Sequence, residues 1–282
     1  MAFASALGTN VAFLFKYRGA VAAPPVRAAH PLRSAVGLFR SRWFAVGWAV
    51  AVAAWALHVG ALALAPLSIV QAVLSGGLVF LAVLAERYFG FRLGRRQWIG
   101  VIVTAAGLAV IALTGGLHTV VAPHYSLAAL IAVEAGIFAL GAALTLISMH
   151  GSFGPAAEGL LLGVAAGVLF GVSDIALKYL THAVGGGLHG LISPWALTAI
   201  AASVVAFYAS ARGLQLGRAV EVIAFTSVAA NLAAITGGIL VFRDPIGSGA
   251  PAIVLRVIAF GLVIGGAALM PAPVRTDSRS NG

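Results

Sequence analysis

The segment Phe15-Lys16-Tyr17 near the start of the chain recurs 162 residues later as Leu177-Lys178-Tyr179. Two further pairs keep the same order with an offset of 158 residues: Glu86 with Asp244, and Gly107 with Gly265. Matches at nearly constant register indicate one structural unit present twice. The sequence therefore predicts an internal repeat, with repeat one over about 1–116 and repeat two over about 155–271.

The composition places these repeats in a membrane. Of 282 residues, 61% are hydrophobic and only 9% are charged, and the mean hydropathy is +1.06. A soluble protein of this length needs a charged surface that this chain cannot make. Cysteine is absent, which excludes disulfides and thiolate metal sites. Fifteen of the 17 basic residues are Arg, a bias typical of GC-rich bacterial genomes, so a bacterial plasma membrane is the expected location.

Apolar stretches long enough to cross the hydrocarbon core as helices predict about nine transmembrane spans. These spans lie near 2–15, 43–63, 66–86, 97–115, 125–147, 155–178, 193–212, 219–242 and 250–270. The first span is short, and the true start of its helix lies either at Met1 or upstream of it. The positive-inside rule then predicts the orientation. With the N-terminus outside and the C-terminus cytoplasmic, four connecting or terminal segments place 14 of the 17 basic residues in the cytoplasm.

The count of nine makes the repeats inverted. Four spans, one linker helix at about 125–147 and four further spans give a 4+1+4 layout, in which the second unit is upside down in the bilayer. We expect one transmembrane domain over 1–272 and a disordered cytoplasmic tail over 273–282. Inverted repeats are typical of secondary transporters, whose substrate site lies at the interface of the halves. The bilayer is one expected partner and a small-molecule or cation substrate the other, and either a monomer or a homodimer would suffice.

The sixth span carries a glycine at every fourth position: Gly159, Gly163, Gly167 and Gly171. This spacing keeps the four glycines on nearly one helix face, so that a neighbouring backbone can approach closely. Two interpretations stay open. The face is either a site of static packing or a smooth surface along which the halves move during transport.

Ionisable residues within the spans are the strongest functional candidates, because they are costly in a bilayer. Asp174, in the sixth span, is one of these candidates, and its alternative role is an i,i+4 pair with Lys178. Glu134, in the linker span, is either a proton or cation site or a structural partner of His58 or Arg256.

Four polar residues are further candidates for binding substrate or protons: Asn10, Gln71, His58 and Asn231. For Gln71 and Asn231, ordinary hydrogen bonds between helices are the alternative. His58, Asp174, Asp244 and Arg256 fall in the same half of the bilayer, which suggests a vestibule there. No spacing in the chain matches a known metal-ligand motif, so metal ligands are unassigned.

Several short motifs resemble the drug/metabolite transporter superfamily (EamA-like). They are Ala65-Pro66-Leu67, Leu84-Ala85-Glu86, and Gln97-Trp98-Ile99-Gly100 with Gly107. The 4+1+4 layout and the run from Gly8-Thr9-Asn10 to Lys16 are similar to NIPA-type magnesium transporters. Ala85 departs from the superfamily, which usually has Gly there, and the basic end of the first helix is thinner than in the magnesium group. The resemblance implies transport by alternating access. Small multidrug-type relatives are expected to carry an essential carboxylate on the counterpart of the sixth span, so the resemblance makes Asp174 the preferred coupling residue.

The leading functional expectation is a secondary transporter of the drug/metabolite type that moves a small polar or cationic solute. The alternatives are a magnesium or divalent-cation transporter of the NIPA type and a membrane scaffold that transports nothing. No H-E-x-x-H, G-x-S-x-G or Walker A motif and no cysteine nucleophile is present, so we expect neither an enzyme nor a bound cofactor.

Overall fold

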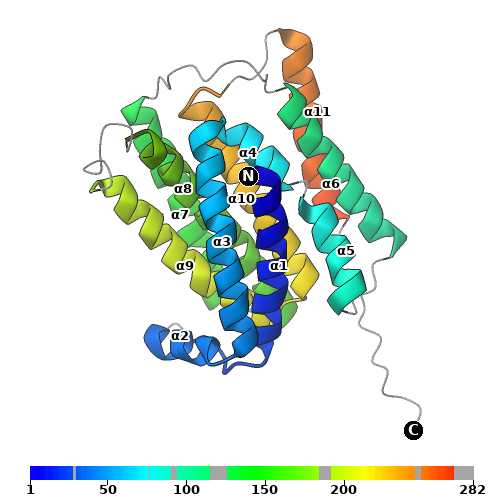
Figure 1. The fold of residues 1–282 in the computed structure, drawn as a ribbon, viewed down its shortest axis with the longest axis vertical. Helices are drawn as coiled ribbons and strands as arrows, with labels where there is room; N and C mark the ends of the chain where they lie inside the picture. The colour runs from blue at the N-terminus through cyan, green and yellow to red at the C-terminus, as the bar shows by residue number, and fades with distance from the viewer. Residues whose placement is uncertain are drawn as a thin grey trace.

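The computed structural model describes residues 1–27, 30–75, 77–89, 94–114, 126–183, 192–244 and 249–269. Within these ranges the regular structure is helical (Figure 1). The helices are α1 (Ala2–Val21), α2 (Pro31–Phe39), α3 (Arg42–Leu64), α4 (Leu67–Ser75), α5 (Gly77–Phe89), α6 (Arg95–Thr114), α7 (Leu127–His150), α8 (Pro155–Ala183), α9 (Pro194–Leu216), α10 (Ala219–Leu240) and α11 (Ala250–Ala268). The predicted tail over 273–282 lies outside the described residues.

Each predicted span falls on a helix, and the third corresponds to α4 and α5 together. Two details differ from the prediction. The first helix continues past residue 15 to Val21. Its two cations lie over aromatic rings, with Lys16 Nζ 4.1 Å from the centroid of the Phe13 ring and Arg18 Cζ 4.1 Å from that of Trp43. Such cation–π contacts accommodate both charges within a helix. The second difference is α2, a short helix that begins at a proline and that the sequence analysis did not predict.

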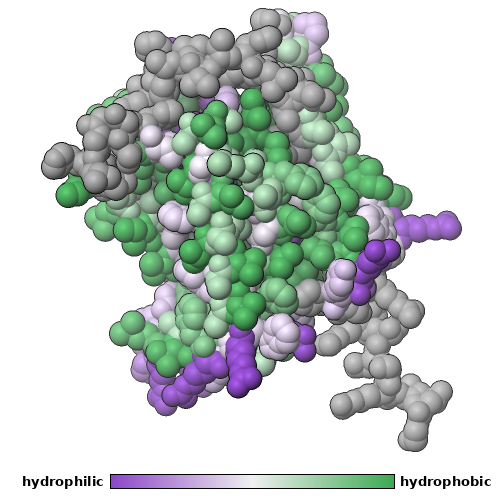
Figure 2. Space-filling model, viewed as in Figure 1, coloured by the Kyte–Doolittle hydropathy of each residue, from purple (hydrophilic) through white to green (hydrophobic). Residues whose placement is uncertain are grey.

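Five of the described helices are long and apolar enough to cross a membrane by length and composition: α3, α7, α8, α9 and α10. Large apolar side chains such as Trp55, Leu140, Ile200 and Val257 are exposed on the outside of the bundle. Figure 2 shows this apolar surface in green across the middle of the molecule, with hydrophilic groups at the lower end and lower right. This distribution is that of an all-α, multi-pass membrane protein.

The lower end in Figure 2 is called the basic end below. It is where α1 ends and α3 begins, and α2 lies across it (Figure 1). The exposed arginines on the segments that meet there are Arg18, Arg27, Arg33, Arg40, Arg42 and Arg218, while Arg87, Arg95 and Arg96 are exposed at the end of α5 and the start of α6. Clusters of arginine beside apolar helices suit the boundary between lipid headgroups and water, where the charges stay hydrated.

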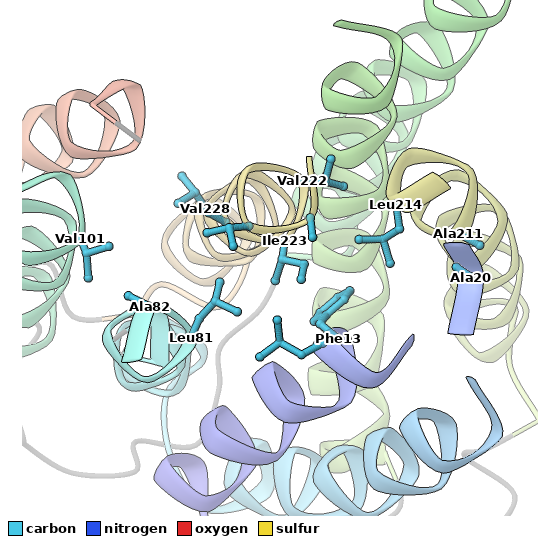
Figure 3. Close-up of a cluster of buried hydrophobic side chains, with 14 of the residues drawn as sticks. Phe13, Ala20, Leu81, Ala82, Val101, Ala211, Leu214, Val222, Ile223 and Val228 are labelled. Carbon is cyan, nitrogen blue, oxygen red and sulfur yellow. The ribbon is translucent and has the colours of Figure 1, made fainter. Parts of the chain in front are cut away.

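The helices pack in corresponding pairs. In the first part of the chain α1 packs along α3, and in the second α8 packs along α9, while α6 and α11 lie side by side apart from both pairs (Figure 1). The main apolar core lies where the two parts meet. Phe13 of α1 and Leu81 of α5 converge there with Leu214 of α9 and Ile223 of α10 (Figure 3). Because this core is shared, the described helices form one packed unit.

The glycine face of α8 packs within the second part of the chain. Gly159 lies against the end of α9, and the other three glycines lie against α10. An added Cβ on Gly163 would meet Val222 Cγ1 at 3.0 Å, and one on Gly171 would meet the Ala230 carbonyl at 3.0 Å. Thr226 also donates a hydrogen bond to the Gly163 carbonyl at 2.9 Å. The face therefore serves close packing inside one half, and it does not lie between the halves.

Replacing Gly167 with Ala should destabilise the fold. The new Cβ would lie 2.8 Å from Ala229 Cβ and 3.0 Å from the Ala230 amide nitrogen, and neither group can move without shifting α10. We expect a loss of about 1–3 kcal/mol, typical of overpacking, measured as a lower apparent melting temperature in detergent. Gly136→Ala is the matched control, because nothing lies within 4 Å of its added Cβ. Equal melting temperatures for the two variants would contradict the packing argument.

Candidate functional site

Asp174 lies on α8 where this helix meets the first part of the chain. Gln71 Nε2, on α4, donates a hydrogen bond to Asp174 Oδ2 at 2.7 Å. His58 Nε2, on α3, lies 3.0 Å from Asp174 Oδ1. The structure thus brings together three residues that the sequence analysis named separately. Three helices from the two halves therefore converge on one carboxylate.

The carboxylate is the only member of this trio that is open to solvent to an appreciable extent. The Asp174 side chain is 17% exposed and the His58 side chain 10% exposed, while Gln71 as a whole residue is 1% exposed. His58 Nε2 and Asp174 Oδ1 share one hydrogen bond, whose donor depends on the tautomer of the histidine. His58 Nδ1 is buried and has no hydrogen-bond partner among the described residues. Asp174 has lone pairs beyond the two that Gln71 and His58 use.

Lys178 does not pair with Asp174, so the alternative role of Asp174, an i,i+4 pair with Lys178, is not observed. Its Nζ donates instead to the carbonyls of Leu62 at 2.6 Å and Ala65 at 2.8 Å. These carbonyls lie at the end of α3, where the chain turns at Pro66 and the helix dipole favours a cation. Lys178 is 5% exposed, so both hydrogen bonds are shielded from water. The second half of the chain therefore binds the end of α3 through a buried ammonium group.

Asp244 completes this contact from the other side of the turn. Its Oδ2 accepts a hydrogen bond from the Ser68 amide at 2.7 Å, at the start of α4, where a helix N-terminus favours an anion. Its charge also acts on Lys178 and Arg256. Lys178 and Asp244 together are called the clasp here, because they hold both sides of the α3–α4 turn. His58, Asp174, Asp244 and Arg256 each take part in polar contacts between helices, and the vestibule suggested from them stays a prediction.

The basic end carries a second set of contacts between the halves. Gln215, near the end of α9, accepts from the Val26 amide at 2.8 Å and donates to the carbonyls of Ala20 at 3.1 Å and Pro24 at 3.0 Å. Phe207, also on α9, lies among aromatic rings of the first part of the chain, with ring centroids 6.4 Å from Phe39 and 6.1 Å from Phe44. The sequence analysis did not predict either residue, and a single Gln or Phe in an apolar helix gives no signal that could have identified them.

The remaining predicted site residues do not join Asp174. Asn10 donates to the Ala6 carbonyl of its own helix at 2.8 Å, and Asn231 is buried on α10 at 6% exposure. Glu134 is 3% exposed and neither of its oxygens has a hydrogen-bond partner among the described residues. The predicted pair of Glu134 with His58 or Arg256 is therefore wrong, because His58 binds Asp174 and Arg256 donates to the Ile111 carbonyl at 3.3 Å.

The chemistry of the Asp174 site favours a cation. A partly exposed carboxylate with spare lone pairs offers the oxygen ligands that hard cations prefer, and Mg²⁺ is commonly held by one or two carboxylates while it keeps several waters. Among the described residues, no group of three or more His, Asp or Glu side chains is arranged to hold a metal ion. Asp174 would therefore contribute one protein ligand to a cation that remains largely hydrated.

No family model matches the chain. No solved structure matches it. One curated protein, named "Probable magnesium transporter NIPA9" from Arabidopsis thaliana, is 25% identical to this chain over an alignment of 281 residues. The alignment covers 96% of this chain and 80% of the relative. The chain is thus a multi-pass membrane protein that is similar, over nearly its whole length, to a protein of the NIPA type.

Proposed function

We propose that this protein is a secondary transporter that carries a small cation across the bilayer, and that Mg²⁺ is the first cation to test. The observation that carries the proposal is the Asp174 carboxylate. It lies where α3, α4 and α8 meet, and it is held in place by His58 and Gln71. Ionised groups at such positions are typical of substrate and ion pathways in membrane proteins.

The arrangement of the helices supports transport by alternating access. The packing of α1 along α3 corresponds to that of α8 along α9, as expected for a 4+1+4 inverted repeat with α7 as the linker. Nine crossings with the basic end in the cytoplasm would follow the positive-inside rule. The matched glycines Gly107 and Gly265 fit the repeat less well, because their surroundings differ. Gly107 packs against Ala259 and Val263, whereas an added Cβ on Gly265 would meet no atom within 4 Å.

Contacts at both ends of the bundle supply two gates. The clasp of Lys178 and Asp244 joins the halves near Asp174, and the Gln215 and Phe207 contacts join them at the basic end. In an alternating-access cycle the contacts at one end of the bundle break while those at the other end stay formed. Asp174 is then open to one side of the membrane at a time. His58 and Gln71 would turn from the carboxylate to the incoming cation's water shell as the site is occupied.

The relative's name supports Mg²⁺ as the cargo, and so does the preference of this ion for carboxylate and water oxygens. A drug/metabolite permease is the second candidate, favoured by the motifs around Pro66, Glu86 and Gln97. It would use Asp174 to bind an organic cation in exchange for protons. If the protein is instead a scaffold that transports nothing, replacing Asp174 with a neutral residue should have no effect on its function.

The test is flux in proteoliposomes that contain the purified protein, a magnesium-sensitive dye and a pH-sensitive dye. We expect external Mg²⁺ to enter at a rate that saturates with its concentration, and empty liposomes provide the baseline. Proton movement driven by tetraphenylphosphonium, with no Mg²⁺ entry, would replace the magnesium proposal with the permease. If folded protein gives neither signal, the proposal of a transporter for either class of cargo is overturned.

A further inference from the structure

Glu134 is a buried acidic residue that the proposed cation site does not use. It lies about a third of the way along α7, a helix whose outer face consists largely of exposed apolar residues. The buried residues of α7 are Leu130, Glu134, Gly141 and Ser148. An added Cβ on Gly141 would lie 2.8 Å from Leu169 Cγ of α8, and Ser148 Oγ donates to the Glu158 carbonyl at 3.2 Å. The buried face of α7, including Glu134, is therefore turned into the protein, toward α8.

The surroundings of Glu134 are apolar. Leu130, one turn away, belongs to an apolar cluster with Ile175 of α8 and Ala234 of α10, and Val133 and Ile137 pack against the same cluster. Neither Glu134 oxygen has a hydrogen-bond partner among the described residues. The carboxyl group is thus held in a dry setting without a donor to stabilise a negative charge.

The charged and titratable groups on the helices that pack against α7 interact with other residues. On α8, Glu158 pairs with Arg212, Asp174 with His58 and Gln71, Lys178 with two carbonyls, and Tyr179 with the Trp195 ring. On α10, Glu221 lies in the first turn, at the basic end. No cation among the described residues forms an ion pair with Glu134. An ionised carboxylate in such a place is strongly disfavoured, and a group of this kind keeps its proton instead.

We propose that Glu134 is a proton-binding site: in the conformation described here the buried, unpartnered carboxyl group of α7 holds a proton. The apolar cluster around Leu130 also contains Leu62 of α3 and Val70 of α4, and these two helices carry His58 and Gln71 of the Asp174 site. Movement of α8 against the first part of the chain would therefore change the surroundings of Glu134. Opening this cluster to water releases the proton, and closing it takes the proton up again. The inference concerns the proton and does not depend on which cargo the protein carries.

A hydrophobic carbodiimide tests the proposal on wild-type protein in its membrane, so that no variant has to fold. The acid O–H adds across one N=C bond of the reagent: the proton goes to nitrogen and the carboxyl oxygen to the central carbon. The O-acylisourea then rearranges by transfer of the acyl group to nitrogen, which gives a stable N-acylurea of the summed mass. Only a protonated carboxyl group that an apolar reagent can reach gives this product efficiently.

Glu158 is the internal control, because it is a partly exposed carboxylate 3.5 Å from Arg212. At pH 7, dicyclohexylcarbodiimide should label the Glu134 peptide at least about tenfold more than the Glu158 peptide, as measured by peptide mass spectrometry. A water-soluble carbodiimide should reverse this preference. Glu134→Gln should lose the label, which would confirm the assigned position. Labelling of Glu158 without labelling of Glu134 would overturn the proposal, whether or not the protein transports Mg²⁺.

Discussion

Asp174→Asn is expected to lower cation flux by roughly two orders of magnitude or more and to leave the protein folded. Asn keeps the size of Asp and can still accept from Gln71 Nε2, so the packing of α8 should persist. The charge, however, is lost. Two unit charges about 4 Å apart attract each other by about 4 kcal/mol at the effective dielectric of a partly exposed site, and each 1.4 kcal/mol is a factor of ten.

Two controls make this result interpretable. Asp174→Glu keeps the charge on a longer side chain and should retain part of the flux. Glu158→Gln removes a carboxylate from the basic end, where its pair with Arg212 is partly exposed, and should change both flux and stability little. Flux is measured with the magnesium-sensitive dye, and folding by size-exclusion chromatography. Wild-type flux in folded Asp174→Asn would remove Asp174 from the transport pathway and favour a scaffold.

Lys178→Met should be the most destabilising of the substitutions considered. Met has nearly the length of Lys but no donor, so the carbonyls of Leu62 and Ala65 would lose the hydrogen bonds that they accept at the end of α3. Asp244 would lose one of the two cations on which its charge acts. Leaving a buried acceptor without its donor typically costs about 1–3 kcal/mol, and this substitution would do so at two carbonyls. We expect a marked fall in the apparent melting temperature in detergent.

A double-mutant cycle separates the charge from the packing. In Lys178→Met with Asp244→Asn, neither charge remains, so the combined loss should be smaller than the sum of the two single losses. Strict additivity would show that Lys178 acts on α3 alone and that the clasp is not a coupled unit. Arg218→Met is the control for a basic residue outside the clasp, because Arg218 is exposed at the basic end and should affect stability by less than about 0.5 kcal/mol.

Prediction from the sequence succeeded for the positions of the helices, and it named three polar residues that the structure brings together. The ends of α3 at Arg42 and Leu64 lie within one residue of the predicted span, because a bilayer requires apolar runs of a certain length and Pro66 ends this one. Asp174, His58 and Gln71 were identified as candidates because polar groups are rare and costly in such helices. That all three would meet was not predicted, since their helices lie far apart in the chain.

Prediction failed where it assigned partners. The pair of Asp174 with Lys178 was inferred from i,i+4 spacing, yet each side chain binds the first half of the chain. Spacing along a helix gives the face of a residue within about a turn, and it gives no information about which neighbouring helix offers a better acceptor. For the same reason the glycine face of α8 could be predicted as a packing surface, whereas its partner, α10, could not.

Length, composition and charge placement therefore dictate the helices, the membrane class and the basic end, because the cost of polar groups in hydrocarbon acts on each segment independently of the others. The tertiary structure decided which groups meet. Lys178 reaches the carbonyls of α3, Asp244 caps α4, and Glu134 has no hydrogen-bond partner within the part of the chain that the structure describes. These outcomes depend on contacts between residues more than a hundred positions apart, and such contacts arise only when the helices have packed.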